Sequence, residues 1–483
     1  MKRQSLSKNL IFQFLYQGLI LVIPLILSPY LTRTLQETAL GIYSYSNSIA
    51  YYFVIAAMLG ISRHGQRMIS QNAENEEKLR RTFWSLFTVH IIISLIVLIV
   101  YFLSILVFVR DNQIIYLIQG FYVASALFDI TWLFYGLENF KSVVVKNTAV
   151  KVIECVLIFC FVKSPADLWK YTLVSTLGLL VGQIVMIPQA INIIPPIHFA
   201  SADMKKHIKP LLVFSISVIA VSLYTVFDKT LLGLMTNKDN VAFYEYSNKI
   251  ITIPKTIIGV VGTVMFPRAC RLASKGDTND QRKYIDYSFM LTAIIGVGSM
   301  MGLIAIAQQF AVIYFGKSFA VCGSVMIALS PLIYIIGIGD IIRTQYMIPN
   351  HMDKQFNICI LLNAFINIVI STLLIPIIGI YGAVLGTVSA ELFGIIFQLM
   401  VCRKFIKLSE ILKTAAPCAI AGLLMLFIIK ILQYNLNYGI ISLLIEIVIG
   451  ACVYGLLIGG YLFLFQQELW RTIFGHARIL KKK

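Results

Sequence analysis

Long apolar runs separated by short polar connections make up most of this sequence. A helix needs about 20 residues to cross a hydrocarbon core of about 30 Å, whereas a barrel strand needs only about 9–11. The runs are of helical length and lack strand-like alternation, so they predict an all-α integral membrane protein with about fourteen transmembrane helices. They lie at 9–32, 40–63, 82–109, 114–137, 143–162, 168–192, 209–235, 241–268, 284–309, 320–348, 353–375, 380–402, 412–433 and 439–465.

The composition is typical of a membrane protein and does not indicate a metal or cofactor site. Apolar residues make up 59% of the chain and charged residues 13%, with a mean hydropathy of +0.84, so a water-soluble fold would have no polar surface to show. The eight cysteines lie in or beside apolar runs without a CxxC pair, which is typical of small apolar filler. We expect no cofactor and no metal.

The placement of positive charge predicts the topology. The net charge is +18, and 30 of the 40 lysines and arginines fall on one side of the membrane if the N-terminus is cytoplasmic. Since basic residues concentrate on the cytoplasmic side, both termini and the loop 64–81 are expected there, and a nucleic-acid partner is not needed to explain the charge. The basic tail, residues 466–483, is expected to lie on anionic membrane lipids.

One motif occurs twice, about half a chain apart. The segment Tyr43–Ile49 reads YSYSNSI, and YEYSNKI recurs 201 residues later at Tyr244–Ile250. Such a repeat in apolar sequence predicts two pseudo-symmetric six-helix lobes, with the matched segments lining a central seam. We expect an N-lobe at 1–200, a C-lobe at 201–408, two extra helices at 409–465 and a cytoplasmic tail at 466–483.

A polar stripe along the run 241–268 contains the most unusual charge. Glu245, Asn248, Thr252 and Lys255 share one helical face, and Lys255 has no acidic residue one turn away. A lysine at mid-membrane costs about 2.5–3.5 kcal/mol, so it should face water, a partner on another helix or an anionic ligand. The alternatives are a pair with a carboxylate of another span, Glu391 or Glu446, or snorkelling along the stem.

Three further pairs of opposite intramembrane charges lie one turn apart on the same helix. Lys249 follows Glu245, Arg343 follows Asp340 and Glu154 follows Lys151 at helical spacing, and we interpret all three as local ion pairs. In the first run the polar residues Asn9, Gln13 and Gln17 share a face ahead of Pro24 and Pro29. That run is either an interhelical polar seam or a bent gate helix beside a lumen.

The sequence contains no recognisable catalytic arrangement. The six histidines are scattered, and HExxH, GxSxG and GxxxxGK[ST] are absent from the printed sequence. We therefore expect a transporter rather than an enzyme. A membrane polysaccharide polymerase or glycosyltransferase is the rival from another class, but the predicted outer loops are short for such chemistry.

Several short motifs resemble one known family. Pro24-x4-Pro29-Tyr-Leu-Thr-Arg33, Gly41-Ile-Tyr43 and Leu59-Gly60-Ile61 are similar to the opening helices of Wzx-type oligosaccharide flippases, the polysaccharide transport family. Asp228-Lys-Thr-Leu-Leu-Gly233, the box at Tyr244 with Pro267-Arg268, and Pro376-Ile-Ile-Gly-Ile-Tyr-Gly-Ala383 resemble later parts of the same proteins. The likeness covers nearly the whole chain.

The resemblance implies the fold of the multidrug/oligosaccharidyl-lipid/polysaccharide exporter superfamily. It also implies a flippase in the bacterial cytoplasmic membrane that carries undecaprenyl-pyrophosphate-linked oligosaccharide to the outer leaflet by alternating access, for capsule, exopolysaccharide or O-antigen synthesis. Polysaccharide polymerase and assembly proteins would be its partners. The alternatives within the superfamily are a cation-coupled drug antiporter and a flippase for lipid II or teichoic-acid precursors; the absence of an arginine inside the first run speaks against lipid II.

We predict that Lys255 meets the pyrophosphate of such a cargo, with Lys229 and Arg33 as partners nearer the outer side. Asn47 and Asn248, and Tyr43 and Tyr244, are the matched positions of the two boxes and are predicted to line the cavity. A drug antiporter would favour a lumen of carboxylates. The residues considered for ion coupling are Asp228, Glu245 and Glu391.

Overall fold

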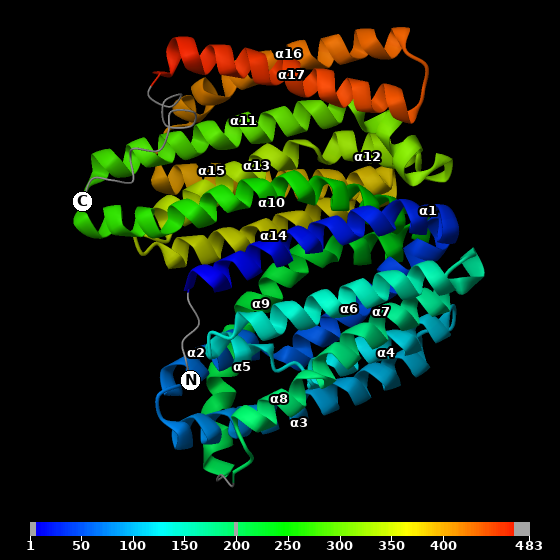
Figure 1. Ribbon diagram of the computed structural model, residues 1–483, viewed down its shortest axis with the longest axis vertical. Coiled ribbons are helices and arrows are strands. Elements are labelled where there is room, and N and C mark those ends of the chain that lie inside the picture. The colour runs from blue at the N-terminus through cyan, green and yellow to red at the C-terminus, as the bar shows by residue number, and fades with distance from the viewer. Residues whose placement is uncertain (1–5, 198–200, 468–483) are drawn as a thin grey trace. The chain divides into compact units, whose positions relative to one another are not determined.

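The computed structural model describes residues 6–197 and 201–467, and within these ranges every regular element is helical. The chain forms two compact units, Met1–Ala242 and Phe243–Lys483, each with its own network of contacts (Figure 1). The predicted all-α membrane fold is thereby confirmed for the described residues. Ten of the described helical stretches are long and apolar enough to cross a membrane.

In the N-terminal unit the first helix contains two predicted spans. Gln36 interrupts α1 with a φ of 63° and a ψ of −178°, so the runs 9–32 and 40–63 occupy separate arms of this helix. The helices of the unit are α1 (Leu6–Met58), α2 (Ile61–Asn72), α3 (Glu76–Phe108), α4 (Gln113–Leu127), α5 (Thr131–Gly136), α6 (Phe140–Phe161), α7 (Leu168–Ile184), α8 (Met186–Ile193) and α9 (Ser201–Met235).

Local sequence signals explain where these helices begin. The Asn75 side chain accepts a hydrogen bond of 2.9 Å from the backbone N–H of Lys78 and so caps α3. Glu76 and Glu77 follow in the first turn, where negative charge stabilises the helix dipole. The short helix α2 packs on α3, α5 and α9 through a core that contains Ile69, Phe83 and Trp132.

The C-terminal unit contains a long helix, two hairpins and irregular turns. Its helices are α10 (Lys238–Lys275, whose first five residues belong to the N-terminal unit), α11 (Thr278–Phe310), α12 (Val321–Leu329), α13 (Pro331–Ile341), α14 (Asp353–Ile378), α15 (Ile380–Cys402), α16 (Leu408–Asn435) and α17 (Ile440–Phe465), with π turns at Ala311–Phe315 and Ile342–Met347. Helices α14 and α15 pack as a hairpin, and the orange-to-red pair α16 and α17 in Figure 1 packs against α11.

Each of the fourteen predicted runs falls on one of these helices or on consecutive helical segments. The first lobe was predicted to end at residue 200, whereas contacts group α9 with the N-terminal unit, because α9 packs on α1, α2 and α3. The lobe boundaries themselves stay a prediction. Residues 468–483 of the predicted tail lie outside the described part of the chain.

Candidate functional site

In the N-terminal unit the repeated box lies on the second arm of α1 and packs against α4 and α7. The centre of the Tyr43 ring lies 4.5 Å from the centre of the Tyr171 ring on α7. The Asn47 amide donates a hydrogen bond of 3.5 Å to Gln119 Oε1 on α4, and Gln119 Nε2 donates one of 3.4 Å to Ser46 Oγ. Gln119 is fully buried, so this side of the box contributes to interhelical polar packing.

Two glycines of the family-like motifs permit close helix contacts. A methyl group at Gly41 would overlap the backbone carbonyl of Lys238 at the start of α10, and one at Gly233 would overlap the Tyr45 ring. The Lys238 amine lies 3.4 Å from the centre of the same Tyr45 ring. These motif glycines are therefore explained by packing within the N-terminal unit.

The predicted outer-side residues lie on α1 and α9. Asp228 is 3% exposed, and its charge acts on Tyr52, whose hydroxyl is 3.0 Å from Thr230 Oγ1. Lys229 is partly buried and Arg33 is exposed just ahead of the turn at Gln36. The side chains of Asn9, Gln13 and Gln17, predicted as a polar stripe, lie outside the described part of the structure.

In the C-terminal unit the second box is anchored by α15. The hydroxyl of Tyr244, which is 6% exposed, lies 3.2 Å from Thr387 Oγ1, and the Asn367 amide of α14 donates to the same Thr387 oxygen at 3.3 Å. Along the stripe, Thr252 donates to the backbone carbonyl of Asn248 at 2.8 Å. Hydroxyls bonded back to their own helix are satisfied locally.

Lys255 interacts electrostatically with an ion pair, Asp340 and Arg343, and we call these three residues the Lys255 cluster. Asp340 forms an ion pair with Arg343, as the one-turn spacing predicted, and also interacts electrostatically with Lys255. With all three groups ionised the cluster carries one net positive charge. Its Lys255 side chain is partly exposed on α10.

The carboxylate that acts on Lys255 is neither of the two that the sequence suggested. Glu391 and Glu446 were the predicted alternatives, but Asp340 is the carboxylate that acts on Lys255. Glu446 instead accepts a hydrogen bond of 2.9 Å from the Gln433 amide, between α17 and α16. Asp340 was overlooked because its spacing to Arg343 already accounted for its charge.

The other local ion pairs predicted within single helices are confirmed. The Lys249 amine lies 3.9 Å from a Glu245 carboxylate oxygen, and that of Lys151 lies 2.7 Å from Glu154. The predicted site residues divide between the two units. Arg33, Tyr43, Asn47, Asp228 and Lys229 belong to the N-terminal unit, and Tyr244, Glu245, Asn248, Lys255 and Glu391 to the C-terminal unit.

Comparison with solved structures relates this fold to a lipid flippase. The structure titled "Lipid II flippase MurJ, inward closed conformation" superposes with a TM-score of 0.77, covering 95% of this chain and 99% of that one at 17% sequence identity. At this identity the likeness concerns the fold alone. It agrees with the superfamily fold implied by the sequence motifs.

Comparison with known sequences identifies the family. Two proteins named "Putative O-antigen transporter" are similar to this chain, one from Shigella dysenteriae and one from Escherichia coli K12. The first is 24% identical over 82% of this chain and 99% of its own length, and the second 22% identical over 83% and 97%. The family described as "Polysaccharide biosynthesis protein" matches residues 6–273, which is more than half of the chain. This multi-pass membrane protein therefore belongs to the polysaccharide biosynthesis protein family.

Proposed function

We propose that the protein is a flippase that moves undecaprenyl-pyrophosphate-linked oligosaccharide across the bacterial cytoplasmic membrane. The observation that carries the proposal is the Lys255 cluster, which places a net positive charge on a membrane helix of a polysaccharide biosynthesis family member. The family membership and the named O-antigen transporters support a polysaccharide precursor as cargo.

The chemistry of the cluster suits a diphosphate. Phosphate oxygens form strong charge-assisted hydrogen bonds with lysine and arginine, and a diphosphate that enters an apolar core needs such cations to offset its lost hydration. Asp340 neutralises part of the charge of Lys255 and Arg343 while no cargo is bound. An arriving pyrophosphate would replace Asp340 as the anion that acts on these two cations.

The direction and coupling of transport follow from topology and chemistry. With both termini in the cytoplasm, as the positive charges predict, the cargo moves from the inner to the outer leaflet for capsule, exopolysaccharide or O-antigen synthesis. We propose alternating access as the mechanism, so that the cargo site opens to one side at a time. Asp228, Glu245 and Glu391 are the candidates for ion coupling.

The test replaces Lys255 with alanine and with arginine. We expect Lys255→Ala to be inserted and folded while lipid-linked oligosaccharide accumulates on the inner leaflet, and Lys255→Arg to retain part of the transport. The matched control is Lys275→Ala, because Lys275 is an exposed lysine at the end of the same helix. The measurement is the amount of lipid-linked oligosaccharide accessible from each face of inverted and right-side-out vesicles.

Two outcomes would contradict the proposal. Normal export by a well-expressed Lys255→Ala protein would remove Lys255 from the cargo site. If Lys255→Ala instead fails to fold and Asp340→Asn restores both folding and transport, the lysine serves to neutralise Asp340 and the cluster is structural.

A further inference from the structure

We propose that a polar groove at one end of α11, α16 and α17 binds the phosphate of an anionic glycerophospholipid of the inner leaflet. The groove has a volume of about 570 Å³ and lies within the C-terminal unit. The proposal concerns a lipid of the surrounding membrane, and it does not depend on the Lys255 cluster or on the proposed cargo.

The groove contains an excess of positive charge. Arg282 and Lys283 of α11 and Lys413 of α16 line it together with two carboxylates, Asp286 and Glu410, so the lining carries one net positive charge with all groups ionised. The predicted topology places this end of α11 on the cytoplasmic side, and a basic pocket between membrane helices on that side is a recognised setting for anionic lipid headgroups. Lysine and arginine are also the side chains that form charge-assisted hydrogen bonds with phosphate.

The wall of the groove is already held in place by protein contacts. Arg282 forms an ion pair with Glu410, which joins α11 to α16, and Thr414 Oγ1 donates to the Glu410 carbonyl at 2.8 Å. Lys283 and Lys413 line the groove and are exposed. A phosphate can therefore reach these two lysines without breaking the ion pair that positions the helices.

The position of the groove along its helices favours a lipid over a soluble phosphate. It lies where the charged first turns of α11 and α16 give way to apolar sequence, beside the far end of α17. Leu412 and Phe465, which are 58% and 72% exposed, are apolar surface near this end and suit contact with acyl chains. Tyr287 and Tyr461 also line the groove, and such aromatic side chains are enriched at membrane interfaces.

The test measures phosphatidylglycerol binding to the full-length protein in detergent by native mass spectrometry. The double variant Lys283→Ala/Lys413→Ala should lose its tightest phosphatidylglycerol with a drop in affinity of about tenfold or more. The control is Lys404→Ala/Lys407→Ala, which removes two exposed lysines from the same side of the protein that do not line the groove. This control should bind the lipid as the native protein does.

Equal loss of affinity in both double variants would overturn the proposal, because lipid binding would then depend only on the total charge. No loss of affinity in either variant would also overturn it, because the lipid would then not bind in the groove. A competition arm identifies the source of the phosphate. If water-soluble glycerol phosphate displaces phosphatidylglycerol at matched concentration, the groove recognises a soluble phosphate and the lipid assignment is wrong. If it does not, the acyl chains contribute and the lipid assignment holds.

Discussion

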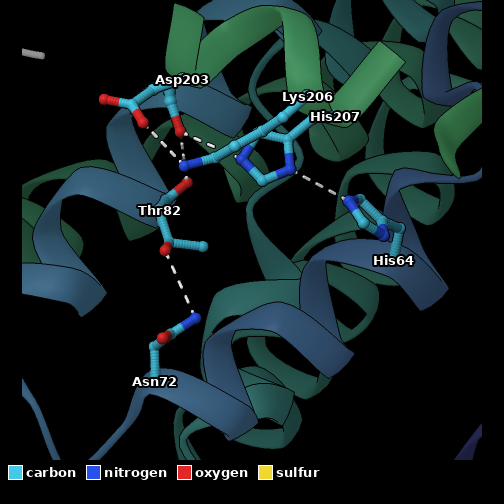
Figure 2. A network of polar contacts seen from close by, with 7 residues as sticks. His64, Asn72, Thr82, Asp203, Lys206 and His207 are labelled. Atoms are coloured by element: carbon cyan, nitrogen blue, oxygen red, sulfur yellow. Dashed lines mark hydrogen bonds and ion pairs between the residues drawn. The ribbon is translucent and has the colours of Figure 1, made fainter. Parts of the chain in front are cut away.

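A pair of buried histidines predicts that acid loosens the contact between α2 and α9. His64 Nε2 on α2 lies 3.2 Å from His207 Nδ1 on α9, and both rings are buried (Figure 2). His207 Nε2 lies 3.3 Å from Ser85 Oγ on α3, and the Ser85 hydroxyl donates to the Thr82 carbonyl. His207 Nε2–H therefore donates a hydrogen bond to Ser85 Oγ, and Nδ1 of the neutral His207 ring accepts one from His64 Nε2–H.

The surroundings keep His207 neutral. Burial lowers the pKa of His207 to about 4, and the positive charges of His64 and Lys206 add to this, whereas Asp203 opposes it. Burial and the charge of Arg67 also lower the pKa of His64. Both residues lie just outside the predicted membrane spans, where protons have access once the helices separate.

The lowered pKa of His207 sets the size and sign of the pH effect on the contact between α2 and α9. When α9 separates from α2 and α3, His207 regains an ordinary pKa of about 6.5, so the open state binds more protons between about pH 6.5 and about pH 4. The contact is thus fully stable above pH 6.5 and weakens as the pH falls. Between about pH 7.5 and about pH 5 the free energy of opening should fall by about 2 kcal/mol, which is about a thirtyfold rise in the open population.

Cysteine labelling measures this opening. Ile61 lies one turn before His64 on the same face of α2 and is fully buried, whereas its neighbour Ser62 is exposed. Ile61→Cys therefore reports opening, and Ser62→Cys corrects for the pH dependence of the thiol reaction. In a background without other cysteines, the ratio of the two labelling rates should rise about thirtyfold from about pH 7.5 to about pH 5. The variant His207→Gln, which cannot titrate, should abolish most of this rise.

The reasoning fails if the ratio stays constant with pH, or if His207→Gln shows the same rise as the native protein. The matched control is His351→Asn, because His351 is an exposed histidine with a φ of 58° that asparagine tolerates. It should leave the pH response unchanged.

Three further predictions address stability and topology. Replacing Glu446 with leucine removes one of the two acceptors of the partly buried Gln433 amide on α16, so it should cost about 1–3 kcal/mol and lower the Tm. Glu446→Gln should cost less, and equal Tm values for the two variants would contradict this. Gly233→Ala places a methyl group against the Tyr45 ring of α1 and should lower the free energy of unfolding by about 1–3 kcal/mol. Gly259→Ala adds its methyl group in open space and should be nearly neutral in the same melting assay. Single cysteines at Asn75 and Asn112 should label from opposite sides of the membrane, and labelling of both from outside would reject the predicted topology.

Features that depend on the solvent and on helical spacing were predictable from the sequence. In lipid a segment must satisfy its own backbone hydrogen bonds, so an apolar run of sufficient length forms a helix whatever its neighbours are. The helical positions of the predicted runs followed from this alone. The ion pair of Asp340 with Arg343 and that of Lys249 with Glu245 followed from the periodicity of one helix.

The contacts between helices were decided only by the tertiary structure. The electrostatic interaction of Asp340 with Lys255, the contact of His207 with His64 and the close approach at Gly41 each join segments far apart in the chain. In a soluble protein the apolar face of a helix reveals which side packs inward. In a membrane the lipid-facing side is as apolar as the packed side, so hydropathy determined that these helices form but could not say which of their faces meet.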